Sequence, residues 1–186
     1  MKKALLLVVG MMLITSLASA QVGTIQLYAD PQLAACDLID SGVFSVYVYH
    51  INTSGATASQ FSVVPRDGAT VSFLGQSSPF PLTDGSAPTG VAVAYGSCLG
   101  TNGPIELLTL TYVGGGTSPV CSYLEVIEDP RAIPPDLYVV DCLLPTPQNL
   151  TGEGSILRIN ADGTCPCVVP VPVQETSWGK IKELYK

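Results

Sequence analysis

The sequence contains a single histidine, and any serine or cysteine nucleophile activated by histidine would have to use it. That residue, His50, follows Phe44, Val46 and Val48 at intervals of two residues. In a β-strand this spacing places all four side chains on one face. An apolar face is typical of the core, so we predict a buried structural histidine rather than a catalytic base.

Three further patterns imitate catalytic or metal-binding motifs. The segment Gly96-Ser97-Cys98-Leu99-Gly100 resembles a nucleophile elbow, but Asn102-Gly103-Pro104 follows where that motif needs a helix. Asp40-Ser41-Gly42 matches one half of an aspartic-protease pair, and the sequence has no second copy. The third pattern is an acidic cluster without the spacing of a calcium loop: Glu125, Glu128, Asp129, Asp136 and Asp141. We therefore assign no catalytic residue, no metal ligand and no cofactor.

The cysteines predict disulfides. There are six, at Cys36, Cys98, Cys121, Cys142, Cys165 and Cys167, and an even number in an exported chain favours oxidation over metal binding. Cys121 and Cys142 are nearly equidistant from a proline-rich turn, so a hairpin there would pair them. The same register would pair Leu124 with Val139 and Val126 with Leu137. We expect a Cys121–Cys142 bridge, then Cys36–Cys98, and disulfides rather than a metal clip at Cys165-Pro166-Cys167.

Residues 1–20 have the features of a cleavable signal peptide. Two lysines precede an apolar run, and Ala18-Ser19-Ala20 supplies small residues before Gln21. The full chain has 8 basic and 15 acidic residues and a net charge of −7. Between Lys3 and Lys180 the only basic side chains are Arg66, Arg131 and Arg158, which argues against a nucleic-acid partner. We expect an exported protein that is periplasmic, cell-surface or extracellular, with no transmembrane segment after cleavage.

Residues 21–165 show a period of two almost throughout, with Gly, Pro, Asn and Asp between short apolar runs. This pattern predicts an all-β domain, a two-sheet antiparallel β-sandwich that is immunoglobulin-like or cohesin-like. Turns are expected at Asp67-Gly68, Asp84-Gly85, Asn102-Gly103 and Asp162-Gly163. The nine predicted strands are 24–28, 42–51, 58–64, 70–74, 89–95, 105–113, 120–127, 136–142 and 154–160.

The C-terminus forms a separate compositional zone. Residues 166–175 are rich in proline and valine and read as a stiff linker. Residues 176–186 then predict a short amphipathic helix with lysines on one face. Its apolar face consists of Trp178, Ile181, Leu184 and Tyr185. Such a face is too small to stabilise a free helix, so we expect a recognition tail for a secretion or envelope receptor. The alternative is a helix that packs on its own domain.

Several segments resemble a family of exported bacterial cysteine-containing β-sandwich proteins that have no assigned activity. The matching pieces include Leu27-Tyr28-Ala29-Asp30, Tyr47-Val48-Tyr49-His50, Val139-Val140-Asp141-Cys142 and the ending of pattern T-x-W-G-x-x-K-x-L-Y that begins at Thr176. Similar endings are found on otherwise unrelated secreted proteins. The resemblance implies compartment and architecture, and it transfers no site residue.

Two classes of function fit these observations. The first is an exported, non-catalytic structural or adhesive module with a C-terminal recognition or sorting tail. The second is a module that binds carbohydrate or another ligand, for which the clearest outward aromatic pair is Tyr47 and Tyr49 beside Ser45. A hydrolase is the third and least favoured class.

Overall fold

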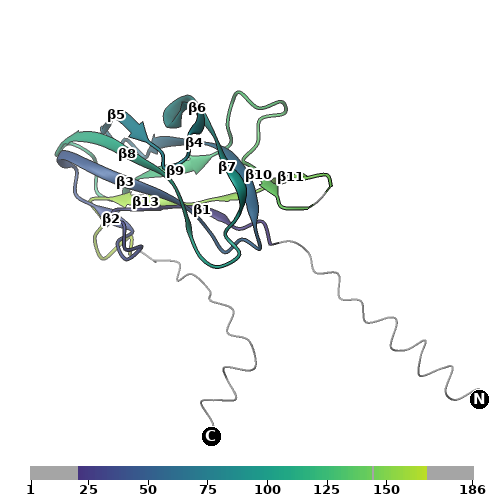
Figure 1. The fold of residues 1–186 in the computed structure, drawn as a ribbon. Helices are drawn as coiled ribbons and strands as arrows, with labels where there is room; N and C mark the ends of the chain where they lie inside the picture. Colours follow the sequence, from purple (N-terminus) through teal and green to yellow (C-terminus); the bar gives the residue numbers. More distant parts are fainter. Residues whose placement is uncertain (1–20, 144, 167–186) are drawn as a thin grey trace, which may run out of the picture.

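The predicted alternation of apolar and polar residues produces two packed β-sheets in the computed structural model, which describes residues 21–143 and 145–166. The predicted signal peptide, the linker from residue 167 onward and the predicted tail helix lie outside the described residues. Figure 1 shows β10 and β11 at one end of the sandwich and β2 at the other. Among the described residues, no helix has the length and hydropathy needed to span a bilayer.

The first sheet has the strand order β12-β1-β3-β8-β5. All its neighbours are antiparallel except β1 and β12, which run parallel. Its strands are β1 (Thr24–Tyr28), β3 (Ser41–Ile51), β5 (Ser72–Ser77), β8 (Ile105–Gly115) and β12 (Glu153–Gly154).

The second sheet has the order β11-β10-β4-β9-β13-β2, and β7 and β6 extend it beside β4. Here too one pair, β13 and β2, is parallel. Its strands are β2 (Asp37–Leu38), β4 (Ala56–Arg66), β6 (Leu82–Ser86), β7 (Gly90–Leu99), β9 (Ser122–Ile127), β10 (Tyr138–Asp141), β11 (Asn149–Thr151) and β13 (Ile156–Ile159). The 3₁₀ turn η1 (Ala87–Thr89) joins β6 to β7.

The core lies between the sheets and is formed by the inward residue of each alternating pair. Val46 and Val48 of β3 face inward, as do Leu108 and Leu110 of β8 and Phe61 of β4. Each of these side chains is fully buried, and burial of one such side chain contributes about 1.5–3 kcal/mol. The two-sheet prediction is confirmed, because inward apolar residues on both sheets form this core.

The structure corrects two local predictions. Asp84-Gly85 is part of strand β6 rather than a turn, and the turn follows it at η1. The strands β2, β6, β11 and β12 were not predicted. They are at most five residues long and lack a sustained apolar alternation.

The predicted hairpin between β9 and β10 is also wrong. Both strands pair with β4 instead, β9 along Ser62–Arg66 and β10 along Ala56–Gln60. The chain between them leaves the sheet as an excursion over residues 128–137, which is closed by a bridge between Asp129 and Asp136. Leu124 and Val139 therefore face the core from consecutive stretches beside β4 and do not pair with each other.

Candidate functional site

His50 is fully buried at the end of the β3 core row, as predicted. Its Nε2 lies 2.8 Å from the carbonyl oxygen of Val22, and its Nδ1 lies 3.2 Å from the hydroxyl of Tyr95. That hydroxyl donates to Ser59 at 2.9 Å. Burial lowers the pKa of His50, and the hydrogen bond to Val22 offsets part of this effect. The imidazole therefore connects the segment before β1 to the core and has a structural role.

The two other imitations of catalytic motifs are structural as well. Cys98 is oxidised, so the elbow-like segment carries no thiol nucleophile. Asp40 is buried, and one carboxylate oxygen accepts a hydrogen bond from the Ser118 backbone at 2.7 Å. Burial raises the pKa of Asp40, but hydrogen bonds from residues 116–118 outweigh this and hold it below its ordinary value. The carboxylate thus orders the loop after β8.

The acidic cluster does not converge on one point. Glu125 pairs with Arg66 at 2.8 Å, and Asp136 accepts from Thr151 at 2.6 Å. Asp141 is buried and accepts from two backbone amides of the loop after β10. Because these carboxylates serve separate local contacts, they do not form a paired acid and base.

The disulfides differ from the predicted pairing. Cys98 bonds to Cys142, and Cys121 bonds to Cys165. Cys36 is also disulfide-bonded, so the predicted Cys36–Cys98 and Cys121–Cys142 bridges are both wrong. β9 and β10 follow one another beside β4, which prevents Cys121 and Cys142 from facing each other. Disulfide use of Cys165 is confirmed, whereas Cys167 lies outside the described residues. Disulfides persist in oxidising compartments, which fits a protein outside the cytoplasm.

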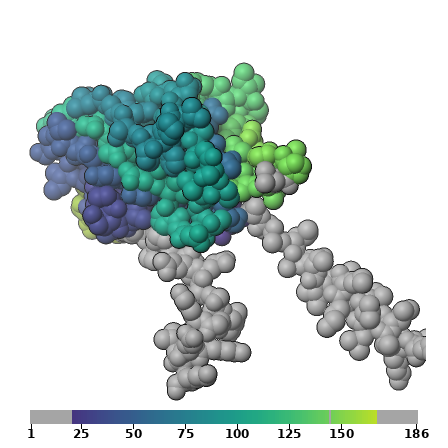
Figure 2. All heavy atoms as spheres, in the orientation of Figure 1, coloured from purple at the N-terminus to yellow at the C-terminus, as the bar shows by residue number. Residues whose placement is uncertain are grey.

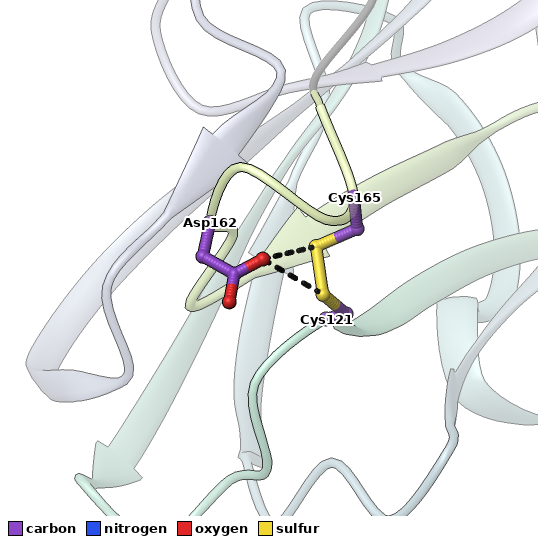
Figure 3. A group of neighbouring side chains, drawn as sticks. All are labelled: Cys121, Asp162 and Cys165. Carbon is purple, nitrogen blue, oxygen red and sulfur yellow. Dashed lines mark hydrogen bonds between the residues drawn. A yellow bond between two sulfur atoms is a disulfide. The ribbon is translucent and has the colours of Figure 1, made fainter.

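One cluster has the composition of a metal site. Ligand atoms of Cys121, Asp162 and Cys165 all lie within 4.8 Å of one another. Figure 3 shows that the two sulfur atoms are joined and that the carboxylate of Asp162 points at them. Zinc binding requires thiolates, and a disulfide supplies none. In this oxidised state the cluster contains a disulfide bond and is not a metal centre. We call the Cys121–Cys165 disulfide the clasp.

The predicted aromatic platform on β3 is largely covered, because Tyr47 is half-buried and Tyr49 is buried. Tyr49 is 8% exposed and packs edge-on against Tyr28, with ring centroids 5.9 Å apart. The segment between β1 and β2 covers it, since the Tyr49 hydroxyl donates to the carbonyl of Pro31 at 3.4 Å and Leu33 packs on the same cluster. Tyr47 and Tyr49 therefore belong to a small second core and do not form a sugar-stacking face.

A groove on the outer face of the second sheet is the best candidate for a binding site. Its volume is about 350 Å³. The register defines its floor, because Ala58 of β4 lies opposite Ala94 of β7, and Gln60 lies opposite Ala92. Small side chains on two adjacent strands leave the sheet surface low at this point. We call this feature the alanine groove.

Larger residues on the flanking strands form its two walls. Leu82, 66% exposed, pairs with Ala94 from the β6 side. Tyr138 of β10 pairs with Gln60 on the other side, and Asn149 of β11 lies beyond Val140. Figure 2 shows the green atoms of β10, β11 and the 128–137 excursion projecting beside the teal atoms of β6 and β7. The backbones of β6 and β10 are three strand spacings apart, about 14 Å.

Charged groups close one end of the alanine groove. Asp129 is fully buried and accepts hydrogen bonds from Gln60 at 2.8 Å and from Arg131 at 2.9 Å. Burial raises the pKa of Asp129, but the hydrogen bonds from Arg131 and Gln60 outweigh this and hold it below its ordinary value. Arg131 also forms an ion pair with Asp84 at 3.2 Å, and the side chain of Asp84 is 89% exposed. Arg131 is thus paired with two carboxylates, and the exposed carboxylate of Asp84 lies at the rim of the groove.

Two glycines make room for this arrangement. A Cβ on Gly85 would clash with the guanidinium of Arg131, and a Cβ on Gly90 would clash with Asp129. Both glycines have positive φ, +88° and +111°, which L-residues with side chains rarely adopt. The excursion can therefore lie close against the β6–β7 hairpin.

The sequence pattern alone does not predict the alanine groove, although part of its signal is present. In the run Val91-Ala92-Val93-Ala94 the valines face the core and the alanines face outward. This alternation predicts a low outer surface on one strand. It does not reveal that Ala58 lies beside Ala94, because the neighbour of a strand is set by the whole topology.

No family model matches the sequence, and no curated protein matches it. Among solved structures, the chain is similar to the cohesin module of a family 33 glycoside hydrolase from Clostridium perfringens. That similarity has a TM-score of 0.50 and 9% identity, and it covers 76% of this chain and 99% of that chain. A second is the sixth cohesin of scaffoldin B from Acetivibrio cellulolyticus, solved with a mutant Cel5 dockerin, at TM-score 0.45, 10% identity and 75% and 99% coverage. At this identity the likeness to the Clostridium perfringens module concerns the fold alone, and that fold is a cohesin-like β-sandwich.

Proposed function

We propose that this chain is an exported, non-catalytic structural or adhesive module that binds a partner protein through the alanine groove. The observation that carries this proposal is an open groove of about 350 Å³ on the outer face of the second sheet, floored by alanines and bordered by exposed apolar and acidic side chains. The residues that imitate catalytic motifs serve structural contacts instead.

The expected occupant is an α-helix of the partner. A helix with its side chains is about 10–12 Å wide, which is comparable to the separation of about 14 Å between the backbones of β6 and β10. The alanine floor lets a backbone approach closely, so the buried face of the helix should carry small or medium apolar residues. Leu82 and Tyr138 would then contact its two flanks.

The acidic charge of the domain further restricts which partner helix can bind. The described residues carry thirteen acidic side chains against three arginines, and Arg131 and Arg66 are already paired. The exposed carboxylate of Asp84 stands at the rim of the groove. We therefore expect a lysine or arginine on the partner helix beside its apolar stripe, because complementary charge speeds and orients association.

Site-specific photo-cross-linking tests this proposal. A photoreactive phenylalanine analogue replaces Leu82 at the groove wall, and a matched control replaces Leu74, which is 58% exposed on β5 of the other sheet. The proposal predicts a partner cross-linked from position 82 and absent from position 74, with the cross-link mapped to a helical segment that carries a basic residue. The same products at both positions, no product at position 82, or attachment to a non-helical segment would overturn it.

The second candidate function is carbohydrate binding in the alanine groove. Polar side chains of Asp84, Gln60 and Asn149 line the groove together with Tyr138, and such a set can bind sugar hydroxyls beside a stacking surface. Binding of the purified domain to defined oligosaccharides, lost on Tyr138→Ala, would favour this function. Absence of saccharide binding alongside a helical cross-linked partner would exclude it.

We further propose that a receptor of the secretion or envelope machinery binds the C-terminal tail. The support is compositional, since three lysines and the apolar residues Trp178, Ile181, Leu184 and Tyr185 follow a proline-rich linker. The tail and the alanine groove would then serve different partners.

A further inference from the structure

The clasp between Cys121 and Cys165 has a carboxylate held against it. Oδ1 of Asp162 lies 3.6 Å from Sγ of Cys121 and 3.8 Å from Sγ of Cys165 (Figure 3). A disulfide sulfur carries no proton, so neither contact is a donated hydrogen bond in the oxidised state. The contacts place a negative charge beside the bond that a reductant would have to attack.

The position of this charge is fixed by its own loop. The Asp162 carboxylate accepts hydrogen bonds from the backbone nitrogen of Thr164 at 2.8 Å and from the Thr164 hydroxyl at 2.6 Å. These hydrogen bonds lower the pKa of Asp162, so it is ionised at neutral pH. Asp162 is exposed, whereas both cysteines are half-buried. The charge therefore stands on the solvent side of the sulfurs.

We infer that Asp162 is an electrostatic guard that slows reduction of the Cys121–Cys165 bond by anionic thiols. In the first step a thiolate attacks one sulfur, forms a mixed disulfide and releases the other cysteine as a thiolate. A second thiolate resolves the mixed disulfide, which leaves two cysteine thiols and oxidised reductant. Both the attacking and the leaving sulfur are negative, so a carboxylate within 4 Å opposes each of them.

The guarded bond has a particular place in the chain. Cys165 comes one residue before the end of the described residues, directly ahead of the predicted linker and tail. The bond ties this exit point to the start of β9. Its protection keeps the departure point of the tail covalently fixed, whatever partner the alanine groove has.

The second bond provides an internal comparison. Cys98 is exposed, and within the described part of the chain no carboxylate stands against Cys98 or Cys142 as Asp162 does against the clasp. Because Cys98–Cys142 is accessible without that repulsion, an anionic thiol should reduce it before the clasp.

Reduction kinetics of the folded mature protein test the inference. Glutathione is anionic and cysteamine is cationic. Each is applied at low salt, the reaction is quenched by alkylation, and each cysteine is quantified by peptide mapping. In Asp162→Asn the amide oxygen can still accept from Thr164, and we expect glutathione to reduce the clasp about three- to tenfold faster, with little change for cysteamine. Added salt should narrow the difference between the two proteins, because it screens exposed charges.

Glu128→Gln removes an equal charge from an exposed residue just past the end of β9 that is opposite Cys121, and it should change neither disulfide. Unchanged glutathione kinetics in Asp162→Asn would overturn the inference. Equal acceleration by both thiols would overturn it too, because that result indicates a loosened loop rather than lost repulsion. Faster reduction of the clasp in Asp162→Asn that persists unchanged at high salt would also overturn the inference, because it too would indicate a loosened loop.

Discussion

At the residue scale, the side chains that invite a catalytic interpretation are used to hold the fold together. His50, Cys98 and Asp40 all occupy positions where a folding constraint explains the residue type. The imidazole satisfies the carbonyl of Val22, the cysteine forms a bridge, and the carboxylate orders a loop. None of them borders the alanine groove.

His50 makes stability depend on pH. The folded protein resists protonation of this buried imidazole, whereas the unfolded chain takes up a proton near the ordinary pKa of about 6.5. The unfolded state therefore binds more protons below that pH, and the free energy of unfolding falls as pH drops from 7.5 to 5.5. Urea denaturation across this range should show that decline.

The control for this prediction is His50→Phe. The variant should be less stable at pH 7.5 by about 1–2 kcal/mol, because Val22 and Tyr95 lose a partner. Its stability should change little between pH 7.5 and 5.5. A variant that retains the full pH dependence would show that another group causes it.

At the element scale, the position of the 128–137 excursion depends on glycines in the β6–β7 hairpin. Gly90→Ala should destabilise the protein by about 2–4 kcal/mol, because the added methyl group would displace the buried carboxylate of Asp129. Gly96→Ala is the matched control. It also has positive φ, +76°, but nothing lies within 4 Å of its Cβ position, so it should cost only about 1–2 kcal/mol. Thermal unfolding that ranks the two variants equally would contradict the proposed contact.

The two described disulfides should contribute similarly to stability. Each spans 44 residues, and the chain-entropy model gives about 4 kcal/mol for a loop of that length. The double variants Cys98→Ala/Cys142→Ala and Cys121→Ala/Cys165→Ala should therefore lose comparable amounts in urea denaturation. Peptide mapping of the oxidised wild-type protein should recover these two pairs. Recovery of a peptide pair linked through Cys121 and Cys142 would instead support the hairpin predicted from the sequence.

Particular strands show how far sequence reasoning reaches. The bounds of β1 were predicted to the residue, and β8 nearly so, because each is a run of apolar and β-branched residues bounded by glycine, proline or aspartate. The alternation of apolar residues in Leu124, Val126, Leu137 and Val139 predicted the wrong partner. Those residues needed a buried face beside β4, and alternation carries no information about which strand lies alongside. The disulfide pairing and the alanine groove depend on that missing information.

At the scale of the whole molecule, the domain and the tail are predicted to act separately. Deletion of residues 174–186 should leave the melting temperature of the sandwich unchanged, because the described residues already form a closed core. Export or surface retention should be altered, and Trp178→Ala should reproduce most of that effect. A truncated protein that melts earlier and localises normally would show that the tail packs on its own domain.

The affinity of the cross-linked partner for the purified domain tests the central claim most directly. Ala58→Trp fills the floor of the alanine groove, whereas Thr111→Trp places the same bulky side chain on the outer face of the other sheet. Isothermal titration calorimetry should show at least a tenfold weaker Kd for Ala58→Trp, about 1.4 kcal/mol or more, and an unchanged Kd for Thr111→Trp. Wild-type affinity in Ala58→Trp, or an equal loss in both variants, would contradict docking in the groove.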